Sequence, residues 1–128
     1  MKLLLDSQLL VWGASTPAYL PEAAARLLED GNHELWFSAA SIWELAVKSS
    51  RRKRGFDLDA AGLRADLLDS GYSEISIDGR HGIASAALPW LHRDPFDRIL
   101  LAQAIVEGML LLTADTLLAR YPGPVRQV

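Results

Sequence analysis

The sequence predicts an α/β fold, a three-layer α/β/α sandwich in which helices cover both faces of a mainly parallel central sheet. Short apolar runs such as KLLL (2–5) and LWFS (35–38) recur along the chain, and such runs are typical of strands buried on both faces. Helical segments lie between them, as in parallel strands joined by helices. The 128 residues are half hydrophobic and contain no repeat or linker, so we expect a single domain over residues 1–128.

The first strand, 2–5, is followed by two expected helices. A short helix is expected from Ser7 to about Gly13, because STP directly afterwards breaks the helical pattern. Pro21 then begins a helix rich in alanine and leucine, which Gly31 ends. The chain then reaches the second strand.

The helix after that second strand is expected to run from Ala39 to about Arg52 and to bury one face. Its expected inward-facing residues are Ile42, Leu45, Ala46 and Ser49. Tryptophan is a large side chain that is usually well buried, so we also place Trp36 and Trp43 in the core or at an interface.

The second half of the chain continues the alternation. The expected elements are a helix that Asp57 or Asp59 caps and Gly71 ends, a strand at 74–77, helices at 80–88, 95–108 and 115–121, and strands at 109–113 and 125–128. Pro89 closes one helix, and Pro95 occupies the first position of the long one, where its missing N–H costs nothing.

Composition and charge exclude several classes of protein. There is no cysteine, so neither a disulfide framework nor a thiolate metal site is possible. The apolar runs are too short to cross a bilayer and no signal segment is recognisable, so we expect a cytoplasmic protein without membrane contact. The net charge is -3, yet the segment KSSRRKR (48–54) carries five basic residues and no acid. This segment is either a phosphate-binding strip or a solvated loop that favours solubility.

Five acids occupy unusual places. Asp6 directly follows the first strand, and Glu44 lies in the helix after the second. Asp94 and Asp97 begin the long helix, and Asp115 follows the strand 109–113. Because the carboxyl ends of parallel strands meet at one edge of a sheet, we expect these carboxylates to converge there.

All of these acids except Glu44 also have a simpler interpretation. Asp6, Asp94 and Asp115 are suited to helix capping, and Asp97 to the first helical turn, where the helix dipole favours an anion. Glu44 has no such position. Together, several neighbouring carboxylates repel one another unless cations neutralise them. Oxygen ligands suit Mg²⁺ or Mn²⁺, and these ions suit phosphoryl chemistry.

Other catalytic patterns are absent or weak. His33, His81 and His92 show no paired spacing, so a zinc site is not expected. His92, next to Arg93, either contacts substrate or lies at the surface. The sequence contains no GxSxG, GxGxxG or Walker A motif.

Four segments carry a family resemblance. They are LLLDSQLLVW (3–12), SAASIWELAVK (38–48), HRDPFDRILLAQA (92–104) and LLTAD (111–115). In order, spacing and total length the chain resembles the PIN-domain family, and more narrowly the VapC-type toxins of bacterial toxin–antitoxin pairs.

The resemblance implies roles for particular residues. The divalent metal would be bound by Asp6, Glu44, Asp97 and Asp115, which we call the acid cluster. The residues implied to support it are the acid Asp94, the hydroxyls of Ser7 and Thr113, which would hold water or a ligand carboxylate, and the basic groups Lys48 and Arg98. Two departures are Gln8, where the family often has histidine, and RRKRG in place of a milder glycine-containing turn.

The activity implied is that of an endoribonuclease that uses Mg²⁺ or Mn²⁺. Water would attack an RNA phosphodiester in line, leaving 5′-phosphate and 3′-hydroxyl ends. The residues expected to hold the RNA backbone are Lys48, Arg51, Arg52, Lys53 and Arg54. The resemblance also implies a homodimer and a cognate antitoxin whose tail fills the acidic groove. The side chains expected at exposed contact surfaces are Leu9, Trp12 and Trp90.

Three other interpretations remain for comparison. A phosphoryl-transfer enzyme of the haloacid-dehalogenase type needs a second aspartate at position 8, where Gln8 stands. A response-regulator receiver domain needs a paired acid and a late lysine, which this chain lacks. The third is a PIN-like module that has lost catalysis and only binds RNA or protein, and the presence of all four acids argues against it.

Overall fold

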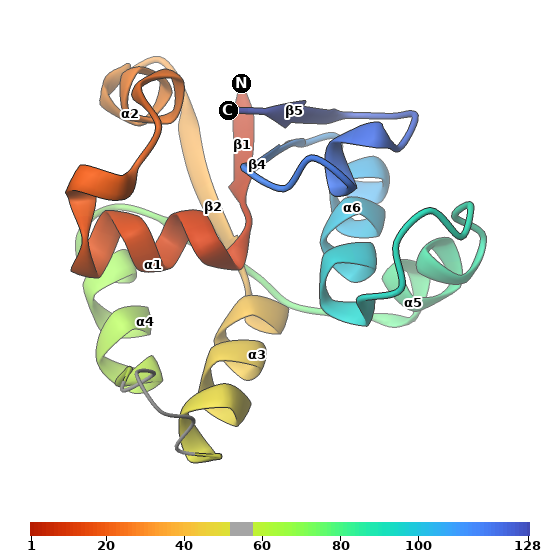
Figure 1. Cartoon of the computed structure of the whole chain (residues 1–128), viewed down its shortest axis with the longest axis horizontal. Helices are drawn as coiled ribbons and strands as arrows, with labels where there is room; N and C mark the ends of the chain where they lie inside the picture. Colours follow the sequence, from red (N-terminus) through yellow and green to blue (C-terminus); the bar gives the residue numbers. More distant parts are fainter. Residues whose placement is uncertain (52–57) are drawn as a thin grey trace.

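The computed structural model describes residues 1–51 and 58–128 (Figure 1). Arg52, Lys53 and Arg54, which were expected to contact RNA, lie outside the described residues. In the described part, five strands form one sheet in the order β3-β2-β1-β4-β5, and all four pairings are parallel. The parallel sheet expected from the sequence is therefore confirmed.

The elements alternate along the chain much as expected. They are β1 (Lys2–Leu5), α1 (Ser7–Ser15), η1 (Pro17–Tyr19), α2 (Glu22–Glu29), β2 (Glu34–Ser38), α3 (Ala39–Ser50), α4 (Ala60–Asp69), β3 (Ser73–Ile75), α5 (Gly79–Ala86), α6 (Pro95–Glu107), β4 (Leu110–Thr113), η2 (Leu118–Arg120) and β5 (Val125–Gln127). The helix expected at 115–121 is only the 3₁₀ turn η2, and Pro122 directly afterwards prevents its extension.

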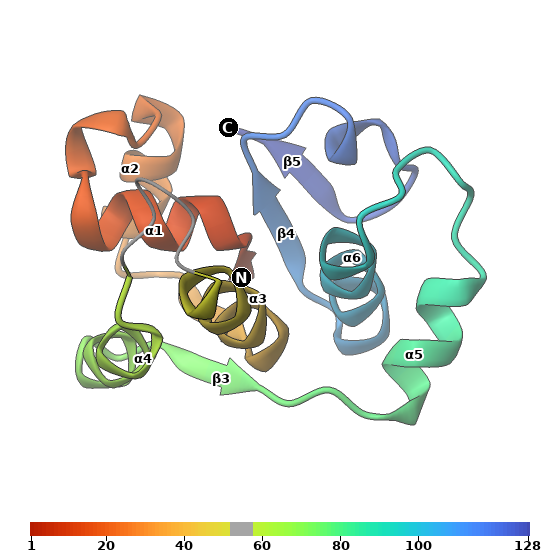
Figure 2. The same cartoon turned by 60° about the horizontal axis from the view of Figure 1, so that its bottom comes forward.

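Alternate side chains of the central strands enter two separate cores, one on each face of the sheet. Leu3 and Leu5 of β1 pack with residues of α1, α2 and α4. Leu4 and Leu111 pack on the other face, mainly with residues of α6, which α5 in turn contacts. Figure 2 shows these two groups of helices on opposite sides of the strands. Burial on both faces explains why the strands are uninterrupted apolar runs, and the sandwich is confirmed.

The exposure of several large side chains differs from the expectation. Leu9 was expected at a contact surface but is only 1% exposed, because it lies on the face of α1 that packs against the sheet. Trp43 was expected in the core or at an interface; it is 60% exposed and therefore not in the core, and it packs edge-on against Phe96. Ala46, expected to face inward, is exposed, whereas Leu45 is buried. The direction of each residue depends on the rotational phase of its helix, which an apolar pattern defines poorly when apolar residues occur all round.

Other expectations about burial agree with the structure. Trp90 is 75% exposed, Trp12 is half-buried and Trp36 packs against the core on the α5–α6 side. Within residues 1–51 and 58–128, no helix has the length and apolar character that crossing a membrane requires.

Candidate metal centre

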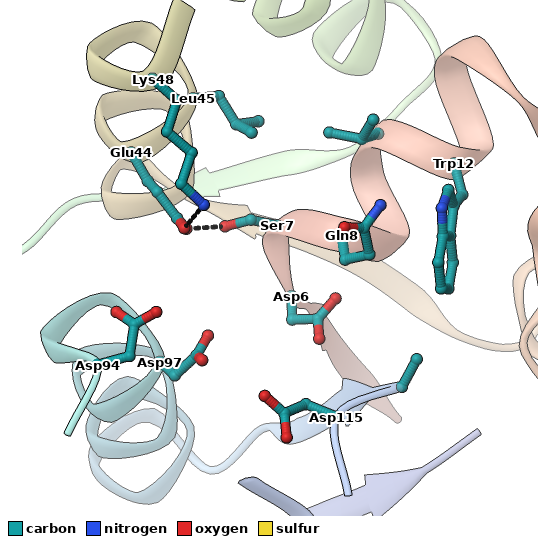
Figure 3. A pocket seen from close by; sticks show the side chains of 12 residues that line it. Asp6, Ser7, Gln8, Trp12, Glu44, Leu45, Lys48, Asp94, Asp97 and Asp115 are labelled. Carbon is teal, nitrogen blue, oxygen red and sulfur yellow. Dashed lines mark hydrogen bonds and ion pairs between the residues drawn. The ribbon is translucent and has the colours of Figure 1, made fainter. Parts of the chain in front are cut away.

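The acids singled out in the sequence meet in one pocket at the carboxyl edge of the sheet. The pocket has a volume of about 390 Å³, and the whole acid cluster lines it together with Asp94, Ser7 and Lys48. Figure 3 shows the carboxylates arriving from separate elements and turning toward a common space. The convergence that a parallel sheet predicts is therefore present.

Asp6 is held at the end of β1 by two hydrogen bonds. Its Oδ1 accepts the backbone N–H of Leu9 at 2.9 Å, so it does cap α1. Its Oδ2 accepts the hydroxyl of Thr113 at 2.6 Å. The side chain is buried, and this burial raises the pKa of Asp6. Asp6 therefore caps α1 and lines the pocket at the same time.

Glu44 reaches the pocket from the inner face of α3 and is only 5% exposed. Its Oε1 accepts the hydroxyl of Ser7 at 2.7 Å, and its Oε2 accepts Lys48 Nζ at 2.6 Å. Lys48 lies one helical turn further on, and its hydrogen bond to Glu44 raises the pKa of the Lys48 ammonium. Ser7 and Lys48 thus fix the orientation of a buried carboxylate, and Lys48 brings a positive charge into the pocket.

Asp94 and Asp97 have separate functions at the start of α6. Asp94 Oδ1 accepts the backbone N–H of Phe96 at 2.9 Å, which makes Asp94 the helix cap, with Pro95 at the first position. Asp97 instead points into the pocket (Figure 3). Burial first, and then the charge of Asp94, raise the pKa of Asp97 to about 7. Ionisation of the carboxyl group in this pocket therefore costs more free energy for Asp97 than for the other acids.

Asp115 is held both by the turn that follows β4 and by His92. Its Oδ1 accepts the N–H groups of Leu117 and Leu118 at 2.8 and 3.2 Å. Partial burial acts to raise the pKa of Asp115, but these two N–H groups and His92 outweigh it, and the pKa is lowered. Asp115 therefore stays ionised at pH values where Asp97 is partly protonated.

His92 is a site residue that the sequence left between substrate contact and surface. Its Nε2 lies 2.9 Å from Asp97 Oδ2 and 3.3 Å from Asp115 Oδ2. Its Nδ1 accepts the backbone N–H of Asp94 at 3.3 Å, so Nε2 carries the proton and donates to Asp115, whereas its contact with Asp97 is electrostatic. The only sequence signal was position, because His92 immediately precedes the acids that begin α6.

Arg98 does not belong to the pocket, contrary to expectation. Its guanidinium is buried on another side of α6, where it donates to Tyr121 Oη at 2.9 Å. It also donates to the backbone carbonyls of Ser85, Leu88 and Pro89 at 2.8 to 3.1 Å. Neighbouring positions on a helix point about 100° apart, so Asp97 and Arg98 face different surroundings. Arg98 stabilises the connection between α5 and α6.

The donor set fits a divalent cation with oxygen ligands. The acid cluster supplies carboxylate oxygens and the chain has no cysteine, which favours Mg²⁺ or Mn²⁺ over softer metals. Ligand atoms of Asp97, Asp115 and His92 lie within 4.8 Å of one another. The like charges that raise the pKa of Asp97 are those that a cation would neutralise.

A second cluster of a histidine and two acids, Asp78, His81 and Glu107, stabilises the fold. His81 is buried, accepts the backbone N–H of Asp78 at 3.0 Å through Nδ1, and lies 3.0 Å from Glu107 through Nε2. Arg80 pairs with both Asp78 and Glu107 at 2.8 Å. The two acids are already neutralised, and the group joins α5 to α6.

The basic residues of 48–54 are only partly described. Lys48 lines the pocket, and Arg51 is exposed immediately after α3. The basic segment therefore begins at the pocket and continues from the end of the helix that carries Glu44.

Comparisons with known proteins identify the family and the fold of this chain. The PIN domain family matches residues 3–124. Ribonuclease VapC22 from Mycobacterium tuberculosis is 30% identical over 125 residues, which are 95% of each chain. A chain in the structure of VapBC2 from Rickettsia felis bound to a promoter DNA fragment is similar with a TM-score of 0.74 and 17% identity, over 100% of this chain and 99% of that one. A toxin–antitoxin complex from Klebsiella pneumoniae gives 0.67 and 20%, over 97% and 95%. The chain belongs to the PIN domain family.

Proposed function

We propose that this protein is a metal-dependent endoribonuclease and the toxin of a toxin–antitoxin pair. The observation that carries the proposal is the acid cluster, four carboxylates from separate elements that line one pocket. Folding these like charges together is costly, so their convergence is best explained by a ligand that neutralises them. A relative that is 30% identical over almost its whole length is named as a ribonuclease, which supports RNA as the substrate.

The acid cluster would hold Mg²⁺ or Mn²⁺. When bound, the ion would lower the pKa of an attacking water and neutralise charge on the phosphodiester. Thr113 fixes the carboxylate of Asp6, and Ser7 fixes that of Glu44, so each ligand is oriented before the ion arrives. Asp94 begins α6 and so sets the direction of Asp97.

The RNA strand would be held by the basic groups around the pocket. Lys48 is placed to contact a phosphate, and Arg51, with Arg52, Lys53 and Arg54, would extend this contact along the backbone. The similarity to chains from toxin–antitoxin complexes supports a cognate antitoxin as partner, and we also expect a homodimer. The whole of residues 1–128 acts as one domain in this proposal.

The test is cleavage of a mixed structured RNA by purified protein in Mg²⁺ or Mn²⁺ against EDTA. Asp6→Asn keeps the shape of the side chain and removes the ligand charge, so we expect cleavage to be lost. Asp69→Asn is the matched control, because Asp69 is an exposed aspartate at the end of α4, outside the pocket. Cleavage that survives both EDTA and Asp6→Asn would contradict the proposal. If the protein binds RNA but never cuts it, a binding module is the better description.

A further inference from the structure

One wall of the pocket does not belong to the acid cluster. It is formed on α1 by Gln8, Val11 and Trp12. Figure 3 shows Gln8 and Trp12 on one side of Asp6, with Asp94 and Asp97 on the other. The pocket therefore has a charged part, suited to a cation and a phosphate, and an uncharged part next to it.

Gln8 and Trp12 are four residues apart on α1, so they lie on the same side of the helix, one turn from each other. The helix holds them firmly, because Asp6 caps it and Leu9 and Leu10 anchor it in the core. Gln8 is exposed and Trp12 is half-buried. Among the side chains drawn in Figure 3, hydrogen bonds join Ser7, Glu44 and Lys48, and none reaches Gln8 or Trp12. A rigid aromatic ring and a free amide thus border the same cavity.

Packing explains only part of this arrangement. Trp12 rests against the core on the α1 side, and that contact accounts for its buried portion. It does not account for the remaining exposure of the ring to the pocket, nor for an amide one turn away that has no hydrogen-bond partner among residues 1–51 and 58–128. If Trp12 served only to cover the core, its ring would not need to face the pocket, and the amide of Gln8 would not be needed beside it.

We propose that Gln8 and Trp12 form a subsite for one unpaired nucleobase, next to the phosphodiester that is cut. An aromatic ring binds any base by stacking, and an amide both donates to and accepts from the edge of a base. The ligand class follows from charge, because a base is neutral and planar, whereas a carboxylate-bearing ligand would be repelled by the neighbouring acids. This inference rests on the proposed function and names where that site would contact its substrate.

Two consequences follow for the reaction. Cleavage should be confined to unpaired RNA, because a base in a duplex cannot leave its partner to stack on Trp12 without a cost in pairing. Gln8 should influence which base is preferred beside the cut, whereas Trp12 should contribute affinity for every base. Trp12 is thus expected to control substrate binding, and Gln8 the choice of cleavage position.

The experiment measures binding of a short fluorescent single-stranded RNA in Ca²⁺, with the oligonucleotide checked to be intact after each titration. The RNA spans a mapped cleavage site, or is poly(U) if no site is found. We expect Trp12→Ala to weaken binding about tenfold, within the range for stacking of a base on an aromatic side chain. Trp12→Phe keeps a ring and should stay close to wild type. Trp90→Ala is the matched control, because Trp90 is an exposed tryptophan that does not line the pocket.

A second arm needs no variant and remains valid even if Trp12→Ala fails to fold. A single abasic position is moved along the mapped oligonucleotide, and wild-type protein should lose affinity at one position only. Uniform affinity across all abasic positions, or an equal loss in Trp90→Ala, would overturn the subsite. If Trp12→Ala leaves RNA binding unchanged but weakens binding of the antitoxin, Trp12 contacts the antitoxin and not a base, and the inference is wrong.

The outcome is separable from that of the proposed function. Metal-dependent cleavage with no effect of Trp12→Ala on binding or cleavage position would remove the subsite alone. Binding that depends on Trp12 without any metal-dependent cleavage would remove the catalytic proposal and leave the subsite.

Discussion

Replacing Asp97 by asparagine should make the metal-free protein more stable, and by much more at about pH 8 than at about pH 5. The reason is the pKa of the Asp97 carboxyl, which is about 7 in the folded protein against an ordinary value of 3.8. Because the folded pKa is the higher one, the folded state holds this proton more tightly than the unfolded state. The resulting stability is present below about pH 4 and is lost as the pH rises through 7.

The size of the effect follows from that shift. About three pKa units, each equivalent to 1.36 kcal/mol, amount to roughly 4 kcal/mol of stability lost when Asp97 ionises. Asparagine avoids this ionisation, and the attraction between the ionised carboxylate and His92, 2.9 Å away, is already contained in the shift. We therefore expect a net stabilisation of roughly 4 kcal/mol at pH 8.

The assay is urea unfolding of wild type and Asp97→Asn in EDTA at both pH values. At pH 5 the folded carboxyl is protonated while the unfolded one is still largely ionised, so the advantage of asparagine should fall to about 1.6 kcal/mol, less than half of its value at pH 8. Asp69→Asn, at an exposed position outside the pocket, should change stability by little at either pH. A difference between Asp97→Asn and wild type that is the same at pH 5 and pH 8 would refute the reasoning, whatever its sign.

Three further predictions concern the surroundings of the acid cluster. His92 Nε2 lies 2.9 Å from Asp97 Oδ2 and 3.3 Å from Asp115 Oδ2, where it would compete with a cation for these carboxylates, so His92→Ala should tighten Mn²⁺ binding about tenfold in a calorimetric titration; weaker binding would mean that the imidazole is a ligand. Thr113→Val removes the donor to Asp6 and the acceptor of the Asp115 N–H, and should cost about 1–3 kcal/mol in urea unfolding, with Thr113→Ser near wild type. Neutralising the basic residues after α3 together should reduce the salt dependence of RNA binding, and an unchanged slope would assign them to solubility. These residues are Arg51, Arg52, Lys53 and Arg54.

The site was largely predictable from the sequence because it depends on strand ends. Asp6 and Asp115 follow two neighbouring parallel strands, β1 and β4, so their proximity needs only the sheet topology. Glu44 was recognisable as an acid on an otherwise inward-facing part of a helix, without a capping position. Once the alternation of strands and helices is recognised, these three positions follow from it.

What the sequence did not reveal depends on side-chain direction. Asp97 and Arg98 are neighbours in the chain, yet one faces the pocket and the other binds carbonyls between α5 and α6. Leu9, and Trp43 as a core residue, were misplaced for the same reason, because a step of one residue turns the side chain by about 100° around the helix. His92 lies in a loop, where no periodicity indicates direction, and its contacts in the folded structure, among them those with Asp97 and Asp115, define its place.

The central claim is that the acid cluster supports attack of water on an RNA phosphodiester, and the chemistry of the product ends tests it most directly. RNA cut by the wild-type protein in Mn²⁺ should carry 5′-phosphate and 3′-hydroxyl ends, and both should vanish with EDTA or with Asp6→Asn. Ends that carry a 2′,3′-cyclic phosphate would show attack by the neighbouring ribose hydroxyl instead of water. That result, obtained with a cleavage that still depends on Asp6, would contradict the mechanism while leaving the location of the site intact.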